Sequence, residues 1–298
     1  MRCYTGGMNA PVEPLPGRAG AVAPGGASVW RAALALAFAR RGERTVLVRR
    51  SHVGPLRVQK ALYPEGEAVC HAIVLHPPAG IVGGDTLHLE VSLDAGAHAL
   101  LTTPGAGKWY RSAGPSASLV QRIVAAEGAV CEWLPQESIV YDGALGTLET
   151  EVDLAGDAAF IGAEMLCFGR TASGERFTHG ALTLATRIRR AGRPLWRERG
   201  CIEGGSPLLA SPVGLAGEPV VGTLLVASPR CDTALRDACR EVPPVVGQGA
   251  VTLLPGLLVA RWLGPACEPG RAWFCDLLAV LRPVVAGRPM RVPRIWNT

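Results

Sequence analysis

The chain is short of the residues on which several classes of function depend. Aromatic residues make up only 5% of the sequence, so it offers few rings on which single-stranded nucleic acid could stack. The net charge of +5 comes from scattered arginines and is a weak sign of nucleic-acid binding. No uncharged apolar run reaches the length of about 18 residues that a membrane-spanning helix needs. Residues 1–28 lack the apolar core of a secretory signal, and we expect a disordered tail there.

Motifs for metal, nucleotide and nucleophilic chemistry are also missing. The nine cysteines include no Cys-x-x-Cys pair and are odd in number, which favours reduced, mostly buried thiols in a cytoplasmic protein. The six histidines are scattered, and no Gly-x-Ser-x-Gly elbow is present. The run Pro104–Lys108 looks like a phosphate-binding loop, whose motif is Gly, four residues, then Gly-Lys-Ser/Thr. Here Thr102 occupies the position of the first glycine, and Trp109 occupies the position of the hydroxyl residue that binds magnesium. Nucleotide binding is therefore not expected.

Glycine, proline and alternating apolar residues are what the sequence has in quantity. Its 37 glycines and 24 prolines favour many short strands joined by turns. Alternation predicts strands at 29–38, 45–48, 69–75, 86–93, 97–103, 118–125, 129–134, 148–154, 182–188 and 194–199. A helical period appears only over 231–242 and 272–281, the second ended by Pro283. Pattern alone predicts one mainly antiparallel β-domain over residues 29–298, with two α-helices near the C-terminus and no clean internal repeat.

Two loops between expected strands carry more special residues than a plain connection requires. The loop His76–Asp85 has two prolines, three glycines and a terminal carboxylate. The second loop, Thr102–Arg111, ends with Lys108, Tyr110 and Arg111. On pattern alone the first loop is a tight structural connection packed against another part of the chain.

Carboxylates in apolar or glycine-rich surroundings are the main candidates for chemistry. They are Asp85, Glu137, Asp142, Glu164 and Glu198. Glu164 is the sharpest case, because the run Phe160–Arg170 around it is almost continuously apolar. A charge buried there must be paired, hydrated or bound to an ion. A salt bridge with Arg170 or another arginine explains Glu164, and so does a hydrated polar passage through a β-core.

Other polar features have plain alternatives. The stretch Arg187–Arg193 could contact RNA, but a hairpin with a basic outward face explains it equally well. His88 and His98 fall on adjacent expected strands and could meet as surface neighbours. Each histidine is more often a solvated or core imidazole than a metal ligand.

Several unusual runs occur in order from about residue 28 to the C-terminus. They are Val53–Leu56, Tyr63–Glu65, His76–Asp85, Thr103–Ala106 with Lys108 and Tyr110–Ser112, Glu132–Glu137, Met165–Arg170, Gly174–Glu175 and Pro293–Trp296. Together these runs resemble the urease accessory protein UreD family, called UreH in some lineages. The sequence departs from the family pattern at Ala79, where a second glycine is usual, at Gly107, where serine or threonine is commoner, and at Trp109, where phenylalanine is.

The resemblance implies a non-enzymatic scaffold that helps to deliver nickel to urease. It implies β-helix-like stacked sheets with helices near the C-terminus. The expected partners are UreF, the GTPase UreG through UreF, and the urease apoprotein. Nickel is then a transient cargo in a water-filled tunnel, with no tightly bound cofactor. Oxygen ligands in such a tunnel would release a divalent cation quickly, whereas thiolate or imidazole cages would trap it.

The resemblance also assigns roles to residues. Asp85, Glu164 and Glu198 are expected along the nickel path, and loop or tunnel positions are expected for Lys108, Tyr110, Arg111, Glu137 and Arg170. Trp273 and Phe274 are candidates for the surface that binds UreF, although core packing explains them equally well. Two alternatives stay open: a passive β-scaffold for complex assembly, and a β-helical carbohydrate-active enzyme with a carboxylate pair.

Overall fold

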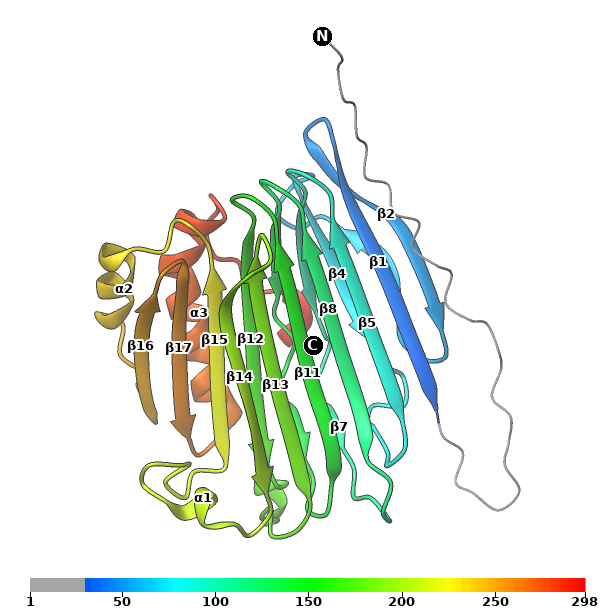
Figure 1. Cartoon of the computed structure of the whole chain (residues 1–298), viewed down its shortest axis with the longest axis vertical. Coiled ribbons are helices and arrows are strands. Elements are labelled where there is room, and N and C mark those ends of the chain that lie inside the picture. Colours follow the sequence, from blue (N-terminus) through cyan, green and yellow to red (C-terminus); the bar gives the residue numbers. More distant parts are fainter. Residues whose placement is uncertain (1–29, 298) are drawn as a thin grey trace.

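Seventeen strands and three α-helices make up residues 30–297, the part of the chain that the computed structural model describes (Figure 1). The expected tail at 1–28 lies outside the described residues. The strands are β1 (Arg31–Arg41), β2 (Arg44–Val53), β3 (Arg57–Leu62), β4 (Val69–Leu75), β5 (Thr86–Leu93), β6 (His98–Thr102), β7 (Gly107–Trp109), β8 (Ala117–Ala125), β9 (Val130–Trp133), β10 (Ser138–Val140), β11 (Leu145–Leu154), β12 (Ala159–Phe168), β13 (Ala181–Arg190), β14 (Arg193–Glu203), β15 (Val220–Ala227), β16 (Gln248–Leu254) and β17 (Leu257–Gly264). The helices are α1 (Pro207–Ala210), α2 (Thr233–Arg240) and α3 (Cys267–Val285), with 3-10 turns η1 (Thr171–Ser173) and η2 (Arg294–Asn297).

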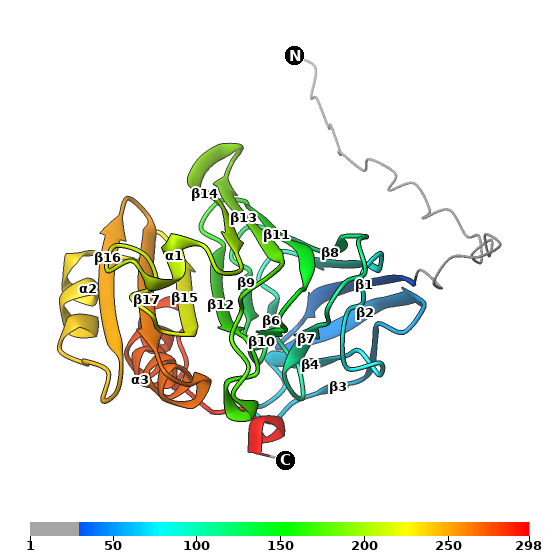
Figure 2. The ribbon, with the colours of Figure 1, turned by 90° about the horizontal axis from the view of Figure 1, so that it is seen from below.

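The strands form two sheets that pack face to face (Figure 2). The front sheet has seven strands in the order β14-β13-β11-β8-β5-β1-β2. The back sheet has ten, with the main order β16-β17-β15-β12-β9-β6-β4-β3 and the short β7 and β10 beside β12. Helix α3 covers the other face of the back sheet, so the molecule has three layers (Figure 2).

Most neighbouring strands within the coiled part are parallel. From β4 to β13 the chain alternates between the back and front sheets, apart from the short β7 and β10, so neighbours in one sheet come from successive coils. The pairs β1–β5, β5–β8, β8–β11 and β11–β13 are parallel in front, and β4–β6, β6–β9 and β9–β12 in the back. The β-helix-like stack is therefore confirmed, and the expectation of a mainly antiparallel sheet was wrong. Alternation shows which face of a strand is buried, not which strand lies beside it.

One tight turn recurs at three crossings from the front sheet to the back sheet, those from β5 to β6, from β8 to β9 and from β11 to β12. The three turns are Asp94–Ala97, Ala126–Ala129 and Ala155–Ala158. In each, the fourth residue's N–H donates to the first residue's carbonyl, at 3.1, 3.0 and 2.9 Å. The turns stack, because the residue after each later turn donates to the last carbonyl of the turn before it. The repeat is hard to detect in the sequence, because the three turns share only a few small residues, mainly alanine and glycine.

The return crossings, from the back sheet to the front, run through longer loops that lie side by side. We call them the loop rim: residues 76–85, 103–116, 134–144 and 169–180. The strand β7 pairs with β10, and β10 pairs with β12. Ile81 of the first loop bridges to Trp109 at the end of β7. Much of the sequence that carries the family resemblance is thus collected at one end of the coil.

Two apolar cores hold the three layers together. The first fills much of the space between the sheets, and the second lies between the back sheet and α3. Trp273 and Phe274 are 3% and 4% exposed in the second core, so packing accounts for both. The prediction that Pro283 ends the helix was wrong, because α3 begins at Cys267 and continues to Val285. A proline in the last turn removes a single N–H donor and leaves the rest of the helix intact.

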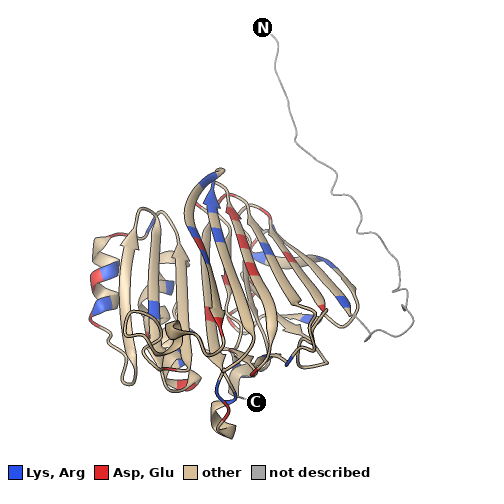
Figure 3. Ribbon diagram, turned by 60° about the horizontal axis from the view of Figure 1, so that its bottom comes forward, with Lys and Arg blue, Asp and Glu red and all other residues tan. Residues whose placement is uncertain are grey.

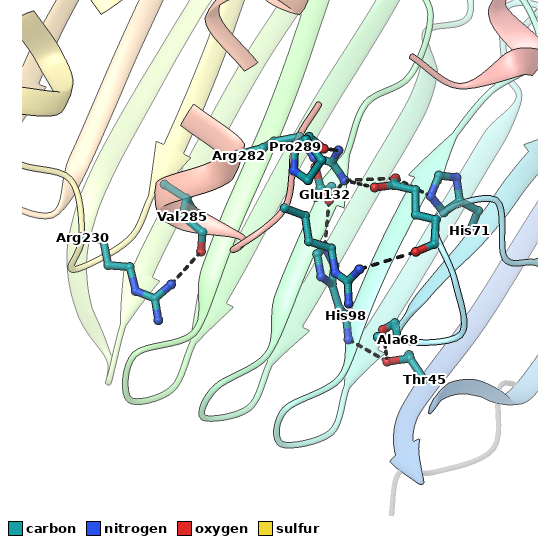
Figure 4. Close-up of polar contacts among 11 residues, drawn as sticks. Thr45, Ala68, His71, His98, Glu132, Arg230, Arg282, Val285 and Pro289 are labelled. Atoms are coloured by element: carbon teal, nitrogen blue, oxygen red, sulfur yellow. Dashed lines mark hydrogen bonds and ion pairs between the residues drawn. The ribbon is translucent and has the colours of Figure 1, made fainter. Parts of the chain in front are cut away.

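A buried cluster of charged and polar groups fastens the end of α3 to the back sheet (Figure 4). The Arg282 guanidinium donates to both oxygens of Glu132 at 2.8 and 2.9 Å, and to both oxygens of Glu65 at 3.1 Å. His98 contacts Glu132 at 2.8 Å and His71 contacts Glu65 at 2.9 Å. Burial would raise the pKa of each carboxyl, but these partners outweigh it and hold both pKa values below their usual range. The two carboxylates therefore stay charged inside the protein.

The outer face of the front sheet carries rows of opposite charge (Figure 3). Arg187 and Arg189 on β13 pair with Glu151 and Asp153 on β11, and the second pair is 2.7 Å apart. Arg122 of β8 reaches Glu151 from the other side, at 3.4 Å. The arginines of the basic stretch thus lie on the outward face of β13 and pair with acidic residues of the neighbouring strand β11. A basic outward face accounts for this stretch without a contact to RNA.

Candidate functional site

A cavity of about 410 Å³ lies between the two sheets and opens at the loop rim. Its front wall runs across five adjacent strands from β5 to β14, a span of about 19 Å at ordinary strand spacing. Most of the wall is apolar, including Leu89 and Leu148 in front and Phe160 and Leu225 behind. A few polar groups interrupt this wall, and they decide what the cavity can hold.

Two of the predicted carboxylates, Glu164 and Glu198, line this cavity from opposite sheets. Glu198 on β14 pairs with Arg261 of β17, where both side chains are partly exposed, at 38% and 45%. Glu164 on β12 has no salt bridge among the described residues, and Arg170 pairs instead with Glu175 at 2.9 Å. The salt bridge expected as the plain explanation of Glu164 is therefore not formed.

Electrostatics give Glu164 a proton affinity unusual for a carboxyl group. Burial raises its pKa, the negative charge of Glu198 raises it further, and Arg261 lowers it, leaving a pKa of about 7. Near neutral pH the group is thus divided between its neutral and charged forms. A carboxyl of this kind is ready to exchange its proton for a cation, because an approaching positive charge favours the ionised form.

A second polar group lies midway along the cavity. The side chain of Gln121 on β8 accepts hydrogen bonds from Trp133 Nε1 at 2.9 Å and from Thr150 Oγ1 at 3.2 Å. All three side chains line the cavity. This trio was not predicted from the sequence, although Gln121 falls between Leu119 and Ile123 on the apolar face of its strand, a position that marks a polar side chain facing the interior.

Asp85 braces the first loop and does not line the cavity. It is 6% exposed, and its two carboxylate oxygens accept from the backbone N–H groups of Trp30 at 3.1 Å and Val82 at 2.9 Å. Its own carbonyl accepts from the Ser118 N–H at 2.8 Å. The lining residue His76 is close enough for the charge of Asp85 to raise its pKa, although burial lowers that pKa overall. The structure thus brings Glu164 and Glu198 together and leaves Asp85 apart.

The second loop forms one side of the cavity mouth. Lys108 lines the cavity, and its carbonyl accepts from the Ile81 N–H of the first loop at 2.7 Å. The ring of Tyr110 lies against Gly80, where a Cβ atom would come within 2.2 Å of a ring carbon. Only glycine fits this contact. The two loops are therefore fixed to each other at the mouth.

The remaining loop residues lie around the rim and pair with one another or with α3. Arg111 reaches Asp142 at 3.3 Å with a side chain that is 72% exposed. Glu137 pairs with Arg271 of α3 at 2.8 Å, and the cavity-lining Gln136 contacts the same guanidinium. Arg170 stacks over the Tyr141 ring at 4.7 Å. Of the five residues expected at the loop or tunnel, only Lys108 faces the cavity.

The structure also bears on the histidines, the loop that resembles a phosphate-binding loop, the cysteines and the possibility of a membrane-spanning helix. His88 is exposed on the front sheet while His98 is buried in the back sheet, so the two histidines, which could have met as surface neighbours, lie in different sheets. Lys108 lies within the three-residue strand β7, and no helix follows before β8 (Ala117–Ala125), which agrees with the rejection of a phosphate-binding loop. Eight cysteines of the described part are free thiols, six of them buried, and Cys3 lies outside that part. No helix within residues 30–297 is long and apolar enough to cross a membrane.

Comparisons with known proteins agree over almost the whole chain. A family model described as UreD urease accessory protein matches residues 31–297. The urease accessory protein UreD of Azoarcus sp. strain BH72 is 70% identical over 269 residues, which cover 90% of this chain and 94% of the relative. The UreD proteins of Dechloromonas aromatica strain RCB and Pseudomonas fluorescens strain Pf-5 are 55% and 50% identical, each covering 90% of this chain and 95% of their own length. The chain belongs to the UreD family of urease accessory proteins.

Proposed function

We propose that this protein serves urease maturation as a cytoplasmic scaffold that also conducts nickel, and that the inter-sheet cavity is the conduit. On this proposal the cation moves between the loop rim and the Glu198 end of the cavity. The expected partners are UreF, UreG bound through UreF, and the urease apoprotein, and no catalysis by this chain is required. The observation that carries the proposal is the pair Glu164 and Glu198 facing one long, otherwise apolar cavity.

The chemistry of the wall suits a cargo better than a resident ion. Two carboxylates from opposite sheets give a divalent cation oxygen ligands, and water completes its shell. Among the described residues no cluster of three or more His, Cys, Asp or Glu side chains could hold a metal. Apolar walls between the polar groups offer a hydrated ion little to bind. Such a passage favours transfer over storage.

The test separates a conduit from a passive scaffold. Glu164→Leu removes the carboxylate and keeps a side chain of similar size, and Glu203→Gln on β14 is the matched control, because Glu203 is exposed and outside the cavity. Urease activity is measured in cells over a range of nickel concentrations, and complex formation is measured by co-purification with the partners. The conduit predicts that Glu164→Leu co-purifies normally but yields much less active urease at low nickel, while Glu203→Gln behaves like the wild type.

The passive scaffold predicts the opposite outcome. If Glu164→Leu assembles and activates urease as well as the control at every nickel concentration, nickel does not depend on this carboxylate. If deletion of the whole chain leaves urease active at ordinary nickel levels, the maturation role itself fails. The two results distinguish an error about the cavity from an error about the protein.

A further inference from the structure

Two buried cysteines from distant parts of the chain meet where α3 begins. Cys167 is near the end of β12 and Cys267 is the first residue of α3, and they are 5% and 8% exposed. Both belong to the apolar core between the back sheet and α3, and their thiols share a hydrogen bond. Neither cysteine lines the inter-sheet cavity.

The strand register and the packing of α3 bring these two residues together. Cys167 of β12 is the register partner of Val220 on β15, and Val220 is that of Gly264 at the end of β17. The chain leaves β17 there and soon begins α3. Met165 points the same way as Cys167, because side chains two positions apart on a strand share a face. Met165 touches the start of the helix, since a Cβ atom added to Gly270 would come within 2.9 Å of its Cε atom. The first turn of α3 therefore lies over Cys167.

The surroundings of Cys167 favour its thiolate form. The hydrogen bond from the Cys267 thiol lowers the pKa of Cys167 to about 7 although burial opposes this, and Thr171 lowers that pKa further. The same contact and burial raise the pKa of Cys267, so the shared proton stays on Cys267. Cys267 opens a helix of 19 residues whose N-cap, Ala266, offers no side-chain acceptor. The N–H groups at such a helix end favour a nearby negative charge.

A thiolate in contact with a thiol is the arrangement from which a disulfide forms. The thiolate is the nucleophile, and the second thiol can attack its sulfur once that sulfur is oxidised. Among residues 30–297 no cluster of three or more His, Cys, Asp or Glu side chains could make the pair part of a metal site. The exposed residues Arg170, Thr171, Pro265 and Glu268 flank the pair in sequence. The two sulfur atoms thus lie close beneath the surface.

We propose that Cys167 and Cys267 form a redox-active pair that a small hydroperoxide converts to a disulfide. The Cys167 thiolate attacks one oxygen of hydrogen peroxide, and the O–O bond breaks. Cys167 becomes a sulfenic acid, and the hydroxide that leaves takes a proton to become water. The Cys267 thiol then attacks the sulfenic sulfur, and its proton leaves with the hydroxyl group as a second water. The peroxide is reduced, the two thiols are oxidised, and one S–S bond is formed.

The disulfide would join the back sheet covalently to the start of α3. The buried cluster around Arg282 already fastens the other end of this helix, so oxidation would hold both ends. A reducing dithiol such as dithiothreitol would reverse the change by thiol–disulfide exchange. The pair is separate from the inter-sheet cavity, and its chemistry does not depend on the proposed function.

Treatment of the full-length chain with hydrogen peroxide, followed by mass spectrometry of its non-reduced peptides, tests the pair. In the wild type a Cys167–Cys267 disulfide is expected, and dithiothreitol should remove it. Cys267→Ser cannot close the bond, so dimedone, which labels sulfenic acids, should trap Cys167 in this variant. Cys167→Ser should give neither product at this site. The control Cys201→Ser removes an exposed cysteine of β14 and should form the disulfide as readily as the wild type.

Two further checks keep the test decisive. Burial in the first core raises the pKa of Cys131, so this cysteine should keep its thiol under the same treatment. Circular dichroism shows whether each serine variant folds, and the wild-type peptides decide the question even where a variant does not. A wild-type chain that keeps both thiols free while Cys201 is oxidised would overturn the proposal, and so would a lasting sulfenic acid at Cys167.

Discussion

Replacing Arg282 with methionine tests the buried cluster that fastens α3 to the back sheet. The Arg282 and Glu132 side chains are both 0% exposed, and the Glu65 side chain is 3% exposed. Methionine keeps most of the aliphatic volume but leaves two carboxylates in the interior without their shared cation. Breaking a buried ion pair from one side costs about 3–5 kcal/mol of unfolding free energy. For a chain of this size that lowers the thermal midpoint by about 6–15 °C.

Urea unfolding followed by circular dichroism measures the change, with Arg199→Met as the control. Arg199 is an exposed arginine on β14, so its loss is expected to change the unfolding free energy by less than about 0.5 kcal/mol. The double variant Arg282→Met with Glu132→Gln is expected to lose less than the sum of the single losses, because one of the two unpaired carboxylates is gone. A loss below about 1 kcal/mol for Arg282→Met would refute the view that the cluster fixes α3.

Three further predictions concern the cavity wall and the first loop. The pKa of Glu164 is raised from 4.5 to about 7, so the folded state holds this proton more tightly than the unfolded chain. The raised pKa therefore makes the largest contribution to the free energy of unfolding below pH 4.5, and this contribution is lost as the pH rises to about 7. It amounts to at most about 3 kcal/mol, and water in the cavity reduces it. Glu164→Gln should therefore match the wild type at pH 5 and exceed it in urea unfolding at pH 8.5; equal stability at both pH values would contradict the shift. Ala79 has φ of 62°, a left-handed conformation that costs an alanine about 1 kcal/mol. Ala79→Gly should raise the thermal midpoint, and a lower midpoint would show that this strain is absent. Asp85→Ala strands two backbone donors and should cost about 2 kcal/mol, whereas an unchanged urea midpoint would show that Asp85 does not brace the loop.

The sequence located most strands because a half-buried strand needs a period of two. Leu87 to Leu93 alternates in the sequence and in the structure, with the leucines and Val91 buried. The short strands β7 and β10 have three residues each, too few for a period to show. Sheet membership was also hidden, because each strand of the coil pairs with residues of the next coil and not with its neighbour in sequence.

The candidate site was half visible. Glu164 stood out because apolar residues surround it in the sequence, and it does face the cavity. Asp85 stood out because it ends a loop rich in proline and glycine, yet its carboxylate accepts hydrogen bonds from the backbone N–H groups of Trp30 and Val82. A sequence shows that an acidic residue lies in an unusual setting, but it does not show whether the carboxylate is hydrated or hydrogen-bonded to the backbone. The partners Arg282 and Glu132 are 150 residues apart, so no local pattern joined them.

Passage of nickel through the inter-sheet cavity can be tested by the nickel content of urease matured with the cavity blocked. Thr223 on β15 lines the cavity beside Glu164, its register partner on the adjacent strand β12, so Thr223→Trp is expected to fill the passage without removing a charge. Thr252→Trp places the same ring on exposed β16, outside the cavity. If both variants co-purify equally with the partners, urease matured with Thr223→Trp is expected to be poor in nickel, and urease matured with Thr252→Trp is expected to hold its full nickel content. Full nickel content with both variants would contradict passage through the cavity.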